Sequence, residues 1–238
     1  MTVVDERDTK EITLPISGKR VVIKEGDGYS TRALLKKNKR IFESIYDYLA
    51  SMCVSIDDKV GVRTQDILKL LAPDQEYLSI EIYKLCYGDI FDFDFTCPGC
   101  GETRPQGVPL DKLEFIPLKE GLAGPDPVIT IDLPRSKKKA IVGILTGEKE
   151  LELLEQAATT GVDLNQGDFK SLRSLGGEIN FSYEDVVRLK LIDHKAIRKA
   201  RQQLICGYDP TVNVVCPECE EKYQINVLMH RDFLLPAG

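Results

Sequence analysis

Cys97-Pro98-Gly99-Cys100 and Cys216-Pro217-Glu218-Cys219 are two copies of one tetrapeptide pattern, the first near the middle of the chain and the second near its end. Each places two thiols at the spacing that lets a tight turn present both sulfurs to one tetrahedral metal ion. A strand-like run precedes each pair, at residues 91–96 and 212–215. This combination is typical of a zinc-ribbon knuckle, a β-hairpin whose turn binds metal.

The composition is that of an ordinary globular protein. The chain has 238 residues, of which 42% are hydrophobic and 29% charged, so it can bury one large core or two small ones. Its apolar runs are shorter than the roughly 18 residues that a membrane-spanning helix needs, and residues 1–8 are too charged for a secretory signal. We therefore expect synthesis in the cytosol and no membrane insertion.

The seven cysteines form two close pairs and three single residues, Cys53, Cys86 and Cys206. In a reducing compartment, close pairs favour metal binding over a disulfide, and single buried thiols behave as small apolar side chains. We expect the single cysteines to lie in the core.

The net charge of −6 argues against a nucleic-acid-binding protein, because such binding depends on a basic surface. Basic runs occur at residues 36–40, 137–139 and 198–201. We interpret them as solvated helix faces and turns rather than as a groove for nucleic acid.

The chain also resembles itself at an offset of 119 residues, without gaps. Twenty identities fall at this offset, against roughly seven expected from ordinary composition. They lie at apolar, turn and knuckle positions; examples are Leu14-Pro15 with Leu133-Pro134 and Gly28 with Gly147. The pattern predicts a tandem duplication, with one repeat at residues 1–119 and the other at residues 120–238.

Each repeat is predicted to be α+β, with an opening β-hairpin, helices and a closing knuckle hairpin. The opening strands are expected at residues 11–14 and 20–24, and again at 128–133 and 140–145. A helix is expected from Ser30 to about residue 53, and its copy from about Glu148 to Gly161. Residues 163–177 are expected to be partly loop.

A broken helix pair follows in both repeats. In the first, residues 64–71 are helical until Pro73 interrupts them, and Asp74 is expected to cap a helix that ends at Gly88. In the second, Ser182 and Asp185 form a capping-box-like start, and Asp193 is expected to cap a helix that ends at Gly207.

One knuckle offers only two of the four ligands that zinc requires. We expect the two knuckles to meet across a pseudo-twofold axis and to bind one structural Zn²⁺ per chain through Cys97, Cys100, Cys216 and Cys219. This ion would join one repeat to the other. The alternatives are knuckles without metal and disulfides formed in air; His230 is a weaker candidate ligand, since its counterpart in the first repeat is Asp111.

The sequence contains no recognisable catalytic motif. The run Glu25-Gly26-Asp27-Gly28 lacks the Lys-Ser/Thr of a phosphate-binding loop. Only His194 and His230 could serve as histidine bases, and there is no nucleophile elbow or metalloprotease helix. We expect a protein without enzymatic activity and without a small-molecule substrate.

The order of elements resembles the baseplate hub protein family of contractile-tailed bacteriophages and related contractile injection systems. The resemblance rests on the opening hairpin Leu14 to Lys19, the helix start with Asp74, Tyr77 and Leu78, its end at residues 85–88, and the strand entering Cys97-Pro98-Gly99-Cys100-Gly101. It covers residues 10–118 well, and the second repeat departs from it in its middle and at residues 207–209.

This resemblance implies a non-enzymatic structural component of a contractile tail baseplate. Its partners would be other tail proteins, such as hub, spike, tape-measure, tube or wedge subunits, and it would assemble in the host cytoplasm and reside in the virion tail. Two alternatives stay open. The protein could be a tail assembly chaperone absent from the mature particle, or a cytosolic zinc-ribbon regulator that binds nucleic acid through residues 198–201.

Overall fold

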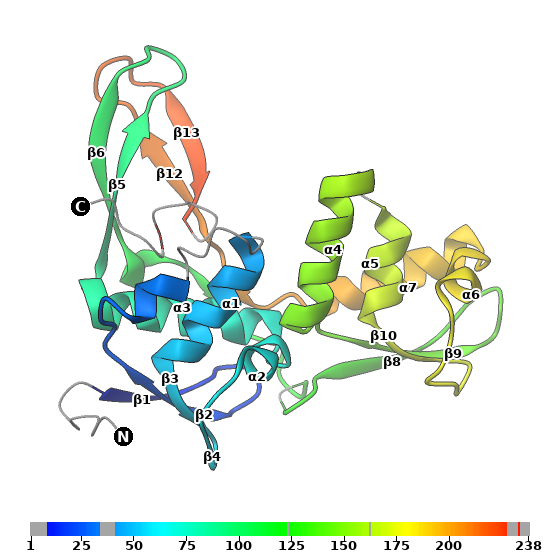
Figure 1. Cartoon of the computed structure of the whole chain (residues 1–238). Helices are drawn as coiled ribbons and strands as arrows, with labels where there is room; N and C mark the ends of the chain where they lie inside the picture. Colours follow the sequence, from blue (N-terminus) through cyan, green and yellow to red (C-terminus); the bar gives the residue numbers. More distant parts are fainter. Residues whose placement is uncertain (1–8, 34–40, 123, 162, 228–232, 234–238) are drawn as a thin grey trace.

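The computed structural model of the chain describes residues 9–33, 41–122, 124–161, 163–227 and 233. It has three parts (Figure 1), which we call the first lobe (residues 9–87), the second lobe (residues 128–203) and the tower (hairpins 90–109 and 211–226). The tower stands on the first lobe, and the second lobe lies beside the first. The structure therefore mixes helices with several small antiparallel sheets.

The first lobe packs helices on a four-stranded sheet of order β1-β2-β3-β4. Its elements are β1 (Thr9–Thr13), β2 (Arg20–Lys24), η2 (Ser30–Ala33), α1 (Ile41–Met52), β3 (Cys53–Ile56), β4 (Lys59–Val60), α2 (Thr64–Leu68) and α3 (Ala72–Tyr87). Alternating residues of β2 put Val21 and Ile23 into the core, the period-two pattern of a strand with one buried face.

The second lobe packs helices on a three-stranded sheet of order β10-β9-β8. Its elements are β8 (Val128–Asp132), β9 (Lys139–Gly143), α4 (Gly147–Thr160), α5 (Leu164–Ser171), β10 (Leu172–Leu175), α6 (Tyr183–Val187) and α7 (Leu191–Gln203). The bounds of β8, β9, β10 and α6 equal those of β1, β2, β3 and α2 plus 119. The register shift between β2 and β3 recurs at the same place between β9 and β10.

The tower consists of two antiparallel hairpins, β5 (Ile90–Thr96) with β6 (Thr103–Pro109) and β12 (Thr211–Val215) with β13 (Lys222–Asn226). Its foot packs on α3, where the ring of Tyr83 stacks on Phe233 and meets the edge of Phe91. After η3 (Leu110–Lys112), β7 (Phe115–Ile116) pairs with β11 (Gly207–Tyr208), so the chain leaving the first hairpin and the chain entering the second run side by side.

Several local predictions are confirmed. Both opening hairpins have the expected strands, α4 ends with Gly161 as its C-cap, and Ser182 and Asp185 form a capping box. The single cysteines Cys53, Cys86 and Cys206 all pack in or against the apolar clusters of the lobes.

Other predictions are wrong at helix ends. The expected helix 30–53 is a 3₁₀ turn followed by α1, and Cys53 already begins β3; residues 34–40 lie outside the described part. The run Cys53-Val54-Ser55-Ile56 pairs with β2 instead, as its β-branched residues favour. The region 163–177 is helix α5 and strand β10 rather than partly loop, and α7 ends at Gln203, before Gly207 opens β11.

Asp74 and Asp193 are not the N-caps that the sequence suggested; Leu71 and Lys190 hold those positions. Instead, each carboxylate reaches from a helix to the turn of an opening hairpin. Asp74 accepts from the backbone N–H groups of Ile16 and Ser17 at 2.9 and 3.1 Å. Asp193 accepts from those of Arg135 and Ser136 at 2.7 and 3.0 Å. Both carboxylates are fully buried, so each turn is fixed to its helix by charge-assisted bonds.

The two lobes meet where the α2–α3 corner of the first receives the β9–α4 turn of the second. Ala72 N–H donates to Leu145 O at 2.9 Å, and Gly147 N–H donates to Leu70 O at 3.0 Å. Gly147 is pressed against Gln75 so closely that a Cβ there would overlap the amide. Residues also cross the boundary: Leu71 belongs to the apolar cluster of the second lobe, and Leu151 packs on that of the first.

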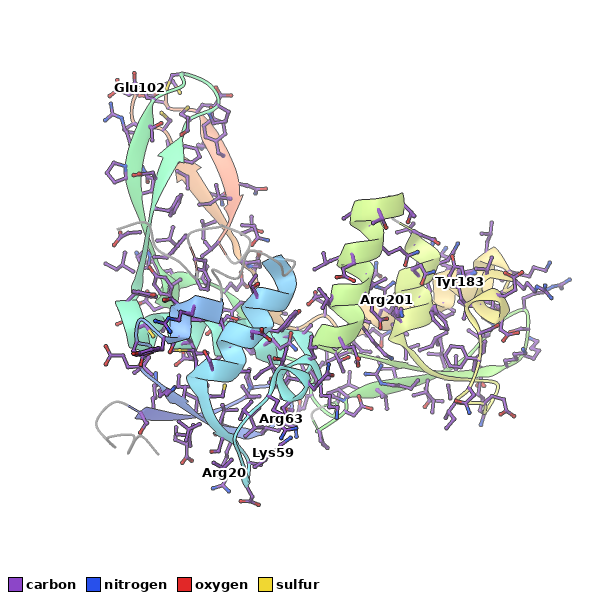
Figure 2. The ribbon with its side chains drawn as sticks, viewed as in Figure 1. Arg20, Lys59, Arg63, Glu102, Tyr183 and Arg201 are labelled. Carbon is purple, nitrogen blue, oxygen red and sulfur yellow. The ribbon has the colours of Figure 1, made fainter. Side chains whose placement is uncertain are left out.

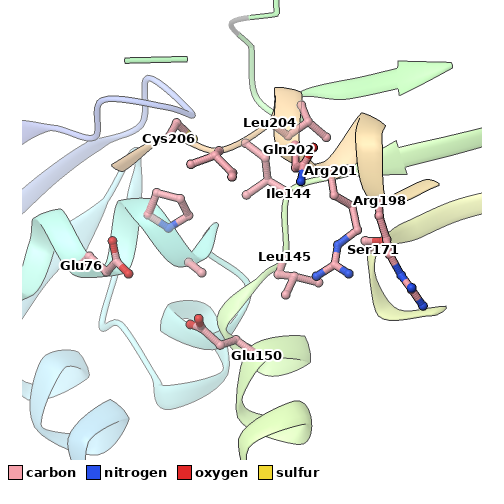
Figure 3. A pocket seen from close by; sticks show the side chains of 14 residues that line it. Glu76, Ile144, Leu145, Glu150, Ser171, Arg198, Arg201, Gln202, Leu204 and Cys206 are labelled. Atoms are coloured by element: carbon pink, nitrogen blue, oxygen red, sulfur yellow. The ribbon is translucent and has the colours of Figure 1, made fainter. Parts of the chain in front are cut away.

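A cavity of about 490 Å³ lies beside this junction (Figure 3). Glu76 of α3 and Glu150 of α4 both line it. Burial raises the pKa of Glu76 to about 7, with help from the charge of Glu150, and burial also raises the pKa of Glu150. The junction therefore places two carboxyl groups where their ionised forms are disfavoured.

We call each buried aspartate with its two backbone N–H donors a carboxylate clamp. The two clamps, at Asp74 and Asp193, predict a similar loss of stability when either aspartate is removed. Asp74→Ala leaves two backbone N–H groups without their acceptor and is expected to cost about 3 kcal/mol. Asp193→Ala removes the same contacts in the second lobe and is expected to cost a similar amount. Denaturant unfolding measures both, with the exposed Asp92→Ala as control. A change for Asp74→Ala no larger than that of the control would contradict this role.

The raised pKa of Glu76 predicts a pH-dependent stability. The pKa of this carboxyl is 4.5 in the unfolded chain and about 7 in the folded one, so the free energy of unfolding falls as the pH rises through this window. Glu76→Gln removes that penalty. The variant should melt at nearly the wild-type temperature below pH 4.5 and at a higher temperature than wild type above pH 7. The exposed Glu11→Gln serves as control, and equal gains at both ends of the range would refute the assignment.

Candidate metal centre

The two cysteine turns have the same backbone fold. Cys97 N–H donates to Glu102 O and Gly101 N–H to Cys97 O, at 2.9 and 2.8 Å. The second turn repeats both bonds, from Cys216 to Glu221 and from Glu220 to Cys216, each at 2.9 Å. Gly101 and Glu220 both have positive φ, 78° and 57°. The turns thus hold each pair of thiols in the same relative positions.

The tower brings the two turns together at its tip, beside Glu102 in Figure 2. The four Sγ atoms of Cys97, Cys100, Cys216 and Cys219 all lie within 4.8 Å of one another. Cys97 Sγ lies 3.6 Å from Cys219 Sγ, and Cys100 Sγ lies 3.8 Å from Cys216 Sγ. Moving each residue by 119 positions exchanges these two contacts, which is the relation expected of a pseudo-twofold axis.

These distances suit a metal site better than disulfides. Four sulfurs at the usual 2.3 Å zinc–sulfur distance stand about 3.8 Å apart in a tetrahedron, whereas bonded sulfurs stand about 2.05 Å apart. All four thiols are free, with Cys97 and Cys216 buried and Cys100 and Cys219 exposed. The donor set therefore fits a soft, tetrahedral cation such as Zn²⁺.

Two residues that the sequence pattern did not mark as part of the site, Tyr223 and Gly99, lie against the thiol cluster. Tyr223 Oη lies within hydrogen-bonding distance of Cys97 Sγ, at 3.4 Å. A Cβ at Gly99 would stand 2.5 Å from Tyr223 Oη and 2.9 Å from Glu221 Oε2, so only glycine admits this approach. The available signal was the difference between the turns: Gly99 corresponds to Glu218, and Tyr223 to Arg104. Arg104 and Glu218 form an ion pair across the two hairpins.

The thiols do not ionise alike. The hydrogen bond between Cys97 and Tyr223, together with the backbone N–H groups of Gly99 and Cys100, lowers the pKa of Cys97 to about 6. The Glu221 backbone N–H lowers the pKa of Cys219, but burial and the other three thiols outweigh it and raise that pKa to about 12. Four thiolates so close together need a compensating positive charge, which a divalent cation would supply.

Neither histidine is placed as a catalytic base by the part of the chain that the structure describes. His194 is buried, and its Nδ1 lies 2.9 Å from Oδ2 of Asp168; Arg198 and Arg201 also donate to this carboxylate. His194 is therefore part of a buried polar network and not an open base. His230 lies outside the described residues.

None of the described helices is both long and apolar enough to cross a membrane.

Comparisons with known proteins bear on the family. Searches of the curated proteins and of the solved structures each returned no significant match. Residues 7–165 match a family described as T4 bacteriophage base plate protein. The match includes the first cysteine pair and ends within α5, before the second pair. Because it covers well over half of the 238 residues, the chain belongs to the family of T4 bacteriophage base plate proteins.

Proposed function

We propose that this baseplate protein is a non-enzymatic structural component of the hub region, in which one structural Zn²⁺ joins two repeats of a duplicated unit. The observation that supports a bound metal is the cluster of four free thiols at the tip of the tower. Family membership carries the baseplate role and implies partners among other baseplate proteins.

The repeats are residues 1–119 and 120–238. Supporting observations are the strands and helices whose bounds differ by 119, the matching register shifts, the paired carboxylate clamps and the two cysteine turns of equal fold. A chance resemblance would not reproduce a buried carboxylate together with both of its backbone donors.

The metal would be bound by Cys97, Cys100, Cys216 and Cys219 as thiolates. Four protein ligands leave no position for water, so such an ion stabilises a structure rather than catalysing a reaction. It would fix the second hairpin, which follows the second lobe, to the first hairpin, which follows the first. The surface of the tower would then be held in one shape for a partner.

The nucleic-acid alternative is weakened by the second lobe. Its basic run was residues 198–201, and Arg198 and Arg201 are both held by the buried Asp168. Guanidinium groups engaged in this way are poorly placed to neutralise phosphates. Retention on DNA that falls with salt would revive this alternative.

Metal analysis tests the centre. The purified protein is expected to contain one zinc per chain, and Cys97→Ser is expected to lower this content and the melting temperature, because three ligands close the site poorly. Cys206→Ser removes a half-buried thiol outside the cluster and should keep the zinc. Zinc at half the protein concentration or less, or unchanged zinc in Cys97→Ser, would contradict a centre within one chain.

Particle composition tests the baseplate role separately. Mass spectrometry of purified tails is expected to find the chain, and the wild-type protein is expected to sediment with assembled particles. Its presence only in assembly intermediates would instead identify a chaperone. Absence from particles and intermediates alike would refute the role, whatever the metal content.

A further inference from the structure

The contact between the lobes uses a different surface from each one. The first lobe contributes its α2–α3 corner, and the second contributes its β9–α4 turn. Such a heterologous contact leaves the complementary surface of each partner uncovered. The uncovered surfaces are the α6–α7 corner of the second lobe (residues 187–192) and the β2–η2 turn of the first lobe (residues 25–29).

The α6–α7 corner is apolar and exposed. Ala72 in the first lobe is 7% exposed beneath the second lobe, whereas its counterpart Leu191 is 86% exposed. Ile192, the counterpart of Pro73, is 54% exposed. Leu191 also begins α7, where a helix leaves its first backbone N–H groups without partners in the helix. In the first lobe the corresponding N–H of Ala72 donates to Leu145 O.

The groove beside each corner gives a second comparison. In the first lobe it has about 340 Å³, and Lys19 and Lys69 line it together with two acidic residues, Asp126 and Glu148, and two basic ones, Lys149 and Arg173. In the second lobe it has about 370 Å³, and its lining comes from that lobe alone. That lining includes four basic residues, Arg135, Lys138, Arg188 and Lys190, and two acidic ones, Asp185 and Asp193, which accept hydrogen bonds from their own lobe. The free groove therefore suits an acidic segment.

The β2–η2 turn has the matching features. Glu25 and Asp27 are exposed, and Tyr29 next to them is 71% exposed, with the Arg32 guanidinium 4.5 Å from the centre of its ring. Gly28 corresponds to Gly147, where glycine is needed because a Cβ would overlap Gln75. At Gly28, no atom of the described residues lies within 4 Å of a Cβ, and its φ lies outside the range that favours glycine. The space beside Gly28 is therefore open to the surface of another molecule.

We propose that the protein associates head to tail with further copies of itself, the β2–η2 turn of one copy docking on the α6–α7 corner of the next. This contact repeats between molecules the one that joins the lobes within the chain. It depends neither on the metal nor on the baseplate role. One interface leaves a free corner at one end and a free turn at the other, so further copies can add.

Sedimentation equilibrium over micromolar to millimolar concentrations tests the association. The wild-type mass is expected to rise above the 26.7 kDa of one chain. Leu191→Glu and Gly28→Ala are each expected to weaken association at least about tenfold, as for residues at the centre of an interface, with an unchanged melting temperature. Tyr29→Lys, which places a cation against the basic groove, tests the turn again if Gly28→Ala folds poorly.

The control variants make the same kinds of substitution outside the two proposed docking surfaces. Val60→Glu alters another exposed aliphatic residue, 76% exposed, and Gly124→Ala alters another glycine with open space around it. Both should associate as wild type does. A mixture of Leu191→Glu and Gly28→Ala chains retains one intact interface and should stop at pairs containing one of each. A monomeric wild type, equally weakened controls, or a mixture without pairs would overturn the proposal.

Discussion

The four thiols at the tip of the tower constrain the path of the entire chain. Cys100 and Cys216 are 116 positions apart in sequence and 3.8 Å apart at their sulfurs. For this to happen, the chain must leave the first hairpin along β7, build the second lobe and return along β11, which pairs with β7, to the foot of the tower. The second lobe is thus an excursion between two strands of one small structure, and its contact with the first lobe must be compatible with that return.

Much of the local structure could be predicted because it depends on short sequence patterns. The hairpin strands alternate, Gly161 ends a helix, and the cysteine pairs mark their turns. Strands β3 and β10 were missed because four-residue strands are too short to show a period, and only pairing with β2 and β9 defines them. Asp74 and Asp193 have the residue type and place of caps, but their partners lie 57 and 58 positions away in the hairpin turns. The sequence contains no local sign of such a contact.

The molecule combines two kinds of internal pairing. The hairpins of the tower use the same surface on each side, with Cys97 beside Cys219 and Cys216 beside Cys100. Such a contact is closed, because it covers the equivalent surface of both hairpins. The lobes instead meet through the α2–α3 corner of the first and the β9–α4 turn of the second. This contact leaves the other corner and the other turn uncovered. The exposed Leu191 beside its buried counterpart Ala72 follows from this difference.

The return of the chain to the tower also sets an order during synthesis. The first hairpin leaves the ribosome before the second lobe exists, and domains fold from the N-terminus onward as they emerge. At that stage Phe91 and Phe93 lack the cover that Val227 and Phe233 later give them in the same apolar cluster. Closing a long loop costs little more entropy than closing a shorter one, so the length of the excursion is no obstacle. The tower can therefore be completed only after translation has passed the second lobe, and a chain truncated before the second hairpin leaves Phe91 and Phe93 without this cover.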